Sequence, residues 1–509
     1  MKQYFFLLLL VSAFACTEKV KYVYYSEYGA VGDGVTDDLD AIIRAHEAAN
    51  EAGIPVRADV GATYYIAGVG KSAEIQTDTD WSDAKFIIDD SKVAVEDRNR
   101  PIFNVSSKLS ETEITSVKTL RKNQEKLDLS LEYPSVIIAT DNTVRRYIRE
   151  GLNQNSGYPQ IDVFVVDKNG NVDMKAPIIW DYDNITTMRA FPVDEETLTV
   201  KGGRFTTIAN QAESRYTYYA RSIWVRRSNV VVDGIYHDIT GELDHGAPYN
   251  GFIHIANCTE VLVQNCMLSG HKVYSTIGAA NAPVSMGTYD TRVNSATNVT
   301  YKNCKQINDI HSPDTWGILA SDYSKNITYD GVEFSRFDAH MGVANATIKN
   351  SILGRQGINI IGSGVFLIEN TKVYAGSFVN LRADYGSTFE GELIIRNCEY
   401  IPNNGRRSDA VLVNGSYSGQ HNFGYTCYMP RKIIIDGLVI HDNNPPEDYQ
   451  GPKIFAPFNR AYTSEEYVEQ YPYVITKEVE ISNLTIKSGK PLIISDNPFL
   501  FRNVKITEK

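Results

Sequence analysis

One short pattern recurs from the middle of this chain to its C-terminus and limits what the chain can fold into. A run of alternating apolar and polar residues ends in Asn or Asp and a small residue, as in NVVVDG at 229–234 and NVTYKNC at 298–304. The Asn or Asp returns about every 20 to 47 residues, a step typical of stacked structural repeats. The markers are Asp233, Asn265, Asn303, Asp330, Asn350, Asn370, Asn397, Asp436 and Asn483. The pattern predicts a solenoid.

Each repeat predicts a strand with one buried face, because side chains alternate along a strand. A single coil cannot bury that face, whereas stacked coils share one core. No segment of this region keeps the apolar period of a helix. We therefore predict an all-β fold, a single-stranded right-handed parallel β-helix. Five cysteines are expected to be small buried ladder residues instead of disulfides or metal ligands: Cys258, Cys266, Cys304, Cys398 and Cys427.

The first residues resemble a bacterial lipoprotein signal. A basic start, an apolar run at 4–11 and small residues at 12–15 precede Cys16, and the run is too short to span a bilayer. The resemblance implies that residues 1–15 are removed and that Cys16 is lipidated, which would anchor the protein in the outer membrane, at the cell surface or the periplasmic face. The net charge of -12 argues against nucleic acid as a partner. Membrane contact is expected through the lipid anchor only.

A second motif, YGAVGDGVTDD at 28–38, precedes an amphipathic helix that is expected to begin after Thr36 or Asp37 and to end at Gly53. Such a helix would cover the open end of a solenoid core. Phrase and helix together resemble the N-terminal cap of the pectate lyase-like β-helix superfamily. That superfamily includes polysaccharide lyases, polygalacturonase-like hydrolases and tailspike depolymerases. The resemblance implies a carbohydrate-active β-helix over residues 22–505.

The pattern is absent from residues 104–201, which we interpret as a β-rich insertion. One stretch, 142–152, is compatible with a helix, and the Asn-Gly-Asn step at 169–171 predicts a hairpin turn. The insertion either forms a groove wall or shields an apolar flank. The predicted organisation is a signal peptide at 1–15, then anchor, cap and first coils at 16–103, the insertion at 104–201, and coils with the groove at 202–509.

Functional side chains are expected on the outer surface of the coils. The strands before the repeated pattern include GFIHIAN at 251–257, PVSMGTYD at 283–290 and AHMGVAN at 339–345. If alternate apolar residues such as Met341 and Val343 point inward, the residues between them point outward. The predicted outward column is His254, His340, Asn359, Asn380, Arg382 and Asn414, with Asp384 and Tyr385 at the end of one strand.

Two chemistries fit such a column. In β-elimination on a uronate, Arg382 and Asn359 would neutralise the carboxylate, His340 would remove the proton and Tyr385 would protonate the leaving oxygen. Hydrolysis needs two carboxylates, and the candidates are Asp314, Asp322, Asp338 and Asp384. The predicted substrate-binding residues are His254, Asn380, Asp384, Trp316 and Asn414. Asp314 and Asp322 are also candidate ligands for Ca²⁺, the one cofactor considered.

A polysaccharide lyase acting on a uronate-containing acidic glycan is the first hypothesis, because His, Arg, Asn and Tyr in one column suit neutralisation of a uronate. Asp338 is included among its catalytic residues. A glycoside hydrolase using paired Asp residues in the same groove is the second. The third is a lipid-anchored glycan-binding protein without catalysis, which would need an aromatic platform such as Trp316, Phe378 and Tyr385. In all three the partner is a polysaccharide.

Overall fold

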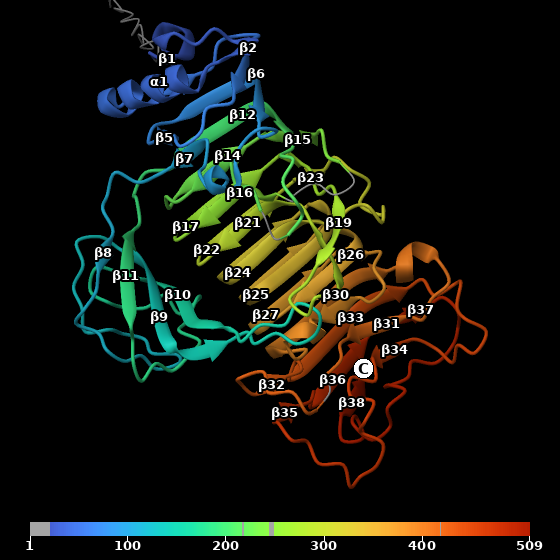
Figure 1. Ribbon diagram of the computed structural model, residues 1–509. Helices are drawn as coiled ribbons and strands as arrows, with labels where there is room; N and C mark the ends of the chain where they lie inside the picture. Colours follow the sequence, from blue (N-terminus) through green and yellow to red (C-terminus); the bar gives the residue numbers. More distant parts are fainter. Residues whose placement is uncertain (1–20, 216–217, 244–248, 418) are drawn as a thin grey trace, which may run out of the picture.

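The computed structural model describes residues 21–215, 218–243, 249–417 and 419–509. Within them, a parallel sheet of 30 strands winds into a right-handed β-helix (Figure 1), and the predicted fold is confirmed. The predicted signal peptide and Cys16 lie outside the described residues. In the described part of the chain, no helix has the length and apolar character needed to cross a membrane.

Each coil contributes strands to three faces. The first face contains β5 (Ala73–Ile75), β7 (Phe103–Val105), β13 (Ile223–Val225), β16 (Asn250–Ala256), β21 (Tyr289–Asn294), the start of β24 (Gly317–Asp330), the middle of β25 (Glu333–Lys349), the end of β26 (Ile352–Ile360), β29 (Val379–Leu381), β31 (Val411–Asn414) and β34 (Lys453–Phe455).

The second face contains β1 (Val23–Tyr24), β3 (Val56–Arg57), the starts of β6 (Thr79–Asp89) and β12 (Leu198–Ile208), β14 (Val230–Asp233), β17 (Thr259–Gln264), β22 (Thr297–Lys302), the ends of β24 and β25, β27 (Gly362–Glu369), the starts of β30 (Phe389–Tyr400) and β33 (Lys432–Ile440), β36 (Glu478–Ser482) and β38 (Lys505–Glu508). The third face contains β2 (Asp33–Asp37), β4 (Thr63–Ile66), the ends of β6 and β12, β15 (Tyr236–Thr240), β18 (Met267–Leu268), β23 (Lys305–Gln306), the starts of β25 and β26, β28 (Lys372–Val373), the ends of β30 and β33, and β37 (Thr485–Ile486).

The repeated sequence pattern ends at the corner between the second and third faces. Asp233 pairs with Gln264, so Gly234 and Asn265 occupy the same place in successive coils. The corner residue has a positive φ, between 47° and 77°, in every repeat: Gly234, Asn265, Asn303, Gly331, Asn350, Asn370, Asn397, Gly437 and Asn483. Gly and Asn are the residues that adopt this conformation most readily. The repeated feature is therefore this backbone conformation, and the Asp markers precede it by one residue.

One continuous apolar core runs along the inside of the coils, from Val23 to Val504. Cys258, Cys266, Cys304 and Cys398 belong to it. These four and Cys427 are buried free thiols. The ladder prediction is wrong for Cys427, which lies in a two-stranded sheet outside the coils.

The N-terminal end of the core is covered by α1 (Leu39–Ala52), as predicted. Ile42, Ala45 and Ala49 are fully buried on its inner side, and the helix ends at Gly53. Its N-cap is Asp38, one residue later than expected, and the Asp38 carboxylate accepts hydrogen bonds from the preceding glycine-containing loop. Four short 3₁₀ helices complete the helical structure of the described residues: η1 (Tyr25–Tyr28), η2 (Val95–Asp97), η3 (Ala383–Tyr385) and η4 (Pro402–Gly405).

An antiparallel sheet separate from the coils lies at the corner between the first and second faces. It contains β8 (Thr112–Glu113), β9 (Ser135–Arg146), β10 (Tyr158–Val166) and β11 (Thr187–Pro192), in the order β10-β9-β11-β8. It has its own apolar core. The chain leaves the coils after β7 and returns at β12. Figure 1 shows this insertion beside the solenoid.

The expected helix at 142–152 is wrong. Residues up to Arg146 belong to β9, because Arg146 pairs with Tyr158 of β10 in the antiparallel ladder, and the residues after it form a loop. The turn expected at 169–171 is present. Gly170 has a positive φ, Asp167 accepts hydrogen bonds from the backbone of Asn169 and Asn171, and Val166 and Val172 are bridged.

A hairpin of β19 (Val273–Ile277) and β20 (Pro283–Gly287) projects from the corner between the third and first faces. The prediction that 283–290 forms a coil strand is therefore wrong, since β20 pairs with β19 and the coil strand is β21. A last pair of strands, β32 (Cys427–Tyr428) and β35 (Tyr473–Val474), joins two loops at the corner between the first and second faces. The first face is thus flanked by the hairpin at one edge and by the insertion at the other.

Candidate active site

The outward residues of the first face form a column along the solenoid. Register pairs align Asn104, Trp224, His254, Arg292 and Ala320, and further along Asp338, Asn359, Asn380 and Asn414. Ser321 pairs with Ala339, and a register shift follows at once. Because of this shift, Asp338 occupies the place in the column that was predicted for His340.

The same shift makes the inward prediction for Met341 wrong. Met341 packs outside the main core, in a small cluster with Tyr147, Ile361 and Tyr385. Phe337 and Ala339 are the β25 residues that point into the core here. His340 is carried away from the column of His254 and toward Asp322.

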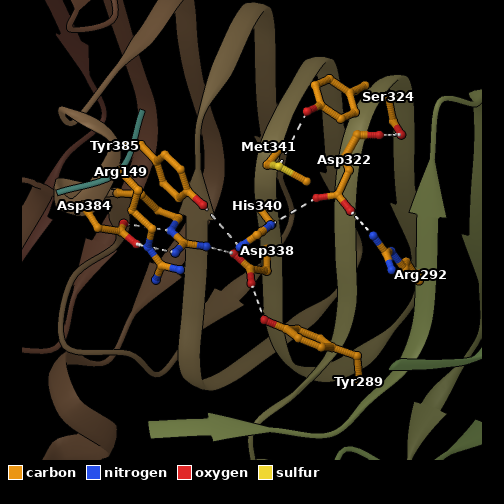
Figure 2. Close-up of polar contacts among 12 residues, drawn as sticks. Arg149, Tyr289, Arg292, Asp322, Ser324, Asp338, His340, Met341, Asp384 and Tyr385 are labelled. Carbon is orange, nitrogen blue, oxygen red and sulfur yellow. Dashed lines mark hydrogen bonds and ion pairs between the residues drawn. The ribbon is translucent and has the colours of Figure 1, made fainter. Parts of the chain in front are cut away.

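His340 lies between a carboxylate and a phenol. Its Nδ1 is 3.1 Å from Oδ1 of Asp322, and its Nε2 is 3.4 Å from the hydroxyl of Tyr385 (Figure 2). Arg292 donates a hydrogen bond of 2.8 Å to Oδ2 of Asp322. Burial acts to raise the pKa of Asp322, but Arg292 and His340 outweigh it and hold that pKa well below its ordinary value. A charged Asp322 fixes the proton of neutral His340 on Nδ1 and leaves Nε2 as the basic nitrogen.

Asp338 is the most heavily paired acid of the group. It is fully buried, and it contacts Arg336 at 2.8 Å and Arg382 at 3.2 Å. The Tyr289 hydroxyl donates a further hydrogen bond of 2.8 Å. Burial acts to raise the pKa of Asp338, but the two guanidinium groups outweigh it, so the pKa is lowered. Asp338 is a charged anchor for two arginines.

Arg382 connects this anchor to the insertion. It binds Asp384 through Nη2 at 2.7 Å, and Nε of Arg149 binds the same carboxylate oxygen at 2.7 Å. Burial alone would lower the pKa of Arg382, but Asp338 and Asp384 raise it. Burial alone would likewise raise the pKa of Asp384, but Arg382 and Arg149 lower it. Figure 2 shows Arg149 and Asp384 beside Tyr385, on the far side of His340 from Arg292.

The charges of this cluster do not cancel. Four arginines (Arg149, Arg292, Arg336 and Arg382) face three charged carboxylates (Asp322, Asp338 and Asp384). The side chains with the most exposure are those of His340 at 28%, Asp384 at 26%, Arg292 at 24% and Arg149 at 20%. Tyr385 is fully buried. The surface of the cluster therefore presents an imidazole, the Asp384 carboxylate and two guanidinium groups.

Amides continue the column toward the C-terminal end. Asn414 donates to Asn380 at 3.0 Å, Asn380 donates to Asn359 at 2.8 Å, and Asn359 donates to the carbonyl oxygen of Gln356 at 2.8 Å. The structure brings these three predicted residues together, in one ladder. Their amides are largely used by one another, with Asn414 the most exposed.

Other predicted residues lie apart from the cluster or beneath it. The His254 ring packs edge-on against Trp224, and its Nε2 is buried without a hydrogen-bond partner. Burial, with Arg292 and Arg226, lowers the pKa of His254 to about 3. Trp316 lies under the guanidinium group of Arg336, 4.8 Å from it. Phe378 is fully buried in the main core, so it offers no exposed platform for sugar stacking.

The structure does not bring Asp314 and Asp322 into one ligand group. Asp314 lies on an exposed turn, where its carbonyl oxygen accepts a hydrogen bond from Val273. Within the described residues, no three or more His, Cys, Asp or Glu side chains are placed to hold a metal ion together.

An open groove of about 680 Å³ adjoins the cluster. Arg149 and Asp384 belong to both. The other lining residues come from the insertion and from two C-terminal coils, and include Leu152, Ser416, Tyr417, Phe458 and Arg460. The groove gives a long ligand room beside the charged residues.

Four cluster residues were not predicted: Arg149, Tyr289, Arg292 and Arg336. Arg292 was missed because the strand of its coil was sought at 283–290, although alternation in YDTRVN at 289–294 places Arg292 outward. Arg336 precedes Asp338 by two positions, so alternation would have found it as well. Arg149 carries no such local signal, because its position depends on how the insertion docks.

Solved structures with the same fold include two phage tailspikes. Tailspike gp61 of Pseudomonas phage phi297 has a TM-score of 0.52 and 13% identity, over 91% of this chain and 80% of that chain. The gp54 tailspike of Acinetobacter baumannii bacteriophage AP22, solved in complex with A. baumannii capsular saccharide, has a TM-score of 0.50 and 12% identity, over 94% of this chain and 76% of that chain. No family model and no curated protein matches the chain. The chain shares the right-handed parallel β-helix of phage tailspikes.

Proposed function

We propose that this protein cleaves an acidic polysaccharide by β-elimination, with His340 as the base. The observation that carries the proposal is the position of His340 between Asp322 and Tyr385, among four arginines. The AP22 tailspike was solved with a capsular saccharide, which supports a polysaccharide ligand on this fold. The substrate class is a glycan that contains uronate residues.

In this reaction His340 Nε2 removes the proton at C5 of the uronate. The bond between C4 and the glycosidic oxygen then breaks, a C4–C5 double bond forms, and the leaving oxygen takes a proton. His340 supplies that proton, because Tyr385, the predicted donor, is fully buried. The 3.4 Å contact from Tyr385 is longer than an ordinary hydrogen bond to nitrogen. It positions the imidazole and leaves Nε2 open to substrate.

The C5 proton becomes acidic only when the charge of the substrate carboxylate is neutralised. Arg292 and Arg149 carry the exposed guanidinium groups on either side of His340. Arg382 and Arg336 are more deeply buried, and both pair with the carboxylate of Asp338. We assign neutralisation to these arginines, in place of Arg382 with Asn359 alone, because the Asn359 amide is held in the ladder.

The carboxylates favour elimination over hydrolysis. A glycosidase needs one carboxylic acid that keeps its proton at neutral pH. The pKa values of Asp322, Asp338 and Asp384 are all lowered, by their arginine partners against the effect of burial. None of the three suits the role of proton donor, and two of them serve to hold Arg382.

The test follows unsaturated product by ultraviolet absorbance and new reducing ends in parallel, on a panel of uronate-containing polysaccharides. Wild-type protein is expected to produce both signals, with or without a chelator. His340→Ala is expected to lower turnover by about 10²- to 10⁴-fold. His441→Ala is the matched control, because His441 has the same side-chain exposure of 28% and a carboxylate partner, Glu399, at 3.0 Å, on the third face. Reducing ends without absorbance would instead indicate hydrolysis.

The lipid anchor belongs to the same proposal. A lipidated Cys16 would hold the enzyme at the outer membrane, where a polymer too large to enter the cell can be cut. Cys16→Ala is expected to move the protein from the detergent phase to the aqueous phase on partitioning. An unchanged distribution would contradict the anchor while leaving the reaction intact.

A further inference from the structure

The first face is crossed by a loop that runs from one edge to the other. The loop, residues 147–153, is called the bridging loop here. Strands of the first face pair in parallel register, so their C-terminal ends share one edge. The insertion leaves the coils at that edge, after Val105, and the β19–β20 hairpin joins them at the opposite edge, before Tyr289. A contact between insertion and hairpin must therefore span the face.

Such a contact is present. The backbone N–H of Ala280, in the hairpin tip, donates a hydrogen bond of 2.9 Å to the carbonyl oxygen of Leu152. A Cβ added at Gly278 would lie 2.6 Å from the same oxygen, so loop and hairpin meet closely. In Figure 1 the blue-green bridging loop extends from the insertion across the coils toward the hairpin.

The bridging loop is also fixed to the floor of the face. The ring of Tyr147 packs against Tyr323 and lies over Gly342, where its hydroxyl leaves no room for a Cβ. Arg149 binds the Asp384 side chain, and the backbone N–H of Glu150 donates 2.8 Å to the Asp384 carbonyl oxygen. These direct contacts leave no passage for a sugar chain beneath the loop at this level.

The loop consequently separates two regions of the first face. Arg292 lies on a coil at the N-terminal side of the loop, His340 lies on the coil that Tyr147 covers, and the groove of about 680 Å³ opens toward the C-terminal coils that carry Ser416 and Phe458. A glycan lying along the column over Arg292 and His340 reaches the bridging loop and stops. The residue that it meets there is Arg149.

We propose that the enzyme binds its glycan by one end and releases short products from that end, with Arg149 facing the terminal sugar. This inference rests on the proposed function, since it concerns the same site. It adds that cleavage proceeds from one chain end, and it assigns this property to the bridging loop and the hairpin tip.

The first experiment follows product length against bonds broken. Wild-type protein is expected to release one short product from the first turnovers while the viscosity of the polymer falls little. A broad ladder of fragments at early times would overturn the inference and leave elimination standing.

Two variants are designed to separate the bridging loop from the hairpin tip. Gly278→Val adds a side chain against the Leu152 carbonyl, and Ala280→Pro removes the N–H donor. Each is expected to increase the share of long fragments several-fold. Gly376→Val is the matched control, because a Cβ at Gly376 meets no atom within 4 Å. Unchanged product lengths in both opened variants, with folding intact, would show that the loop does not set the mode.

A binding measurement separates the inference from catalysis. His340→Ala is titrated with samples of one glycan that have equal mass and different chain lengths. Chain-end binding predicts a capacity proportional to the number of chains, whereas capacity proportional to mass would overturn the inference. A panel that is neither bound nor cleaved would overturn the proposed function, and the mode of action with it.

Discussion

Two adjoining stretches of the first face stack polar side chains in different ways. In the amide ladder, Asn359, Asn380 and Asn414 repeat one residue type, and each amide satisfies the next. In the cluster, Asp338, His340 and Arg382 are all different, and buried charges must be balanced by further charges. A ladder needs only correct stacking, whereas burying charges is costly unless they are paired. The contrast supports the proposal that the cluster serves a ligand, whereas the ladder needs no role beyond the fold.

The largest effect on stability is expected when the shared carboxylate of the cluster is removed. Asp338→Ala leaves Arg336 and Arg382 buried without their shared carboxylate, and we expect a loss of about 3–5 kcal/mol in the free energy of unfolding. Asn359→Ala, at the neighbouring position of the column, is expected to cost about 1 kcal/mol. Urea denaturation of both variants gives the comparison. Equal losses of stability in the two variants would mean that burying charges in the cluster is no more demanding than stacking amides in the ladder.

A third arrangement is found at His254, a half-buried imidazole whose Nε2 is buried without a hydrogen-bond partner. Its pKa in the folded state, about 3, lies below the ordinary value. Between these two pKa values, the unfolded chain binds a proton on His254 and the folded protein does not. Stability is therefore full above about pH 6.5 and falls as the pH is lowered, by at most about 1.4 kcal/mol per pH unit from this residue. Asp338, whose pKa is lowered, loses its contribution only below about pH 4.

The measurement is the thermal midpoint of wild type and His254→Leu between pH 7 and pH 4.5. Burial raises the pKa of Asp90 to about 6, so Asp90 titrates in this window in both proteins and the comparison between them isolates His254. The variant is expected to lose stability less steeply. His46, also buried with a pKa near 3, keeps part of the slope in both proteins. Identical slopes would place the acid sensitivity elsewhere.

A smaller effect than that of Asp338→Ala is expected at the corner between the second and third faces. Asn397 has a φ of 50°, so Asn397→Ala should lower the free energy of unfolding by about 1–2 kcal/mol. Asn397→Gly should be nearly neutral, since Gly437 and Gly331 already serve this place in other coils. Chemical denaturation of the pair tests whether backbone conformation alone is repeated here. A loss as large in the Gly variant would assign the role to the amide.

The fold was predictable because its determinants are local. Each repeat carries its own alternation of apolar and polar residues and its own Gly or Asn at the corner. The signal for one coil therefore occurs nine times between Gly234 and Asn483. The site was predictable in part for the same reason. Asp338, His340 and Arg382 follow from alternation along their strands, although the shift beside Asp322 moved His340 out of the expected column.

What escaped prediction depends on contacts between distant segments. Arg149 reaches Asp384 only because the insertion docks across the face, and nothing in the sequence around residue 149 indicates it. The prediction of a coil strand at 283–290 is wrong because a short alternating run fits either structure, and residues 283–287 form the second strand of the hairpin. Burial of Tyr385 likewise follows from its packing against Tyr147, Met341 and Ile361, which the residues around Tyr385 in the sequence do not specify.

The docking of Arg149 on Asp384 has a consequence for the order in which the protein becomes complete. The two residues are 235 positions apart in the chain. At a synthesis rate of about 5–20 residues per second, the insertion waits roughly 10–50 s for its partner to emerge. Early coils can stack on one another during that time, but the charged cluster still lacks Arg382, Asp384 and Tyr385. The cluster is therefore completed only when the C-terminal coils have joined the stack.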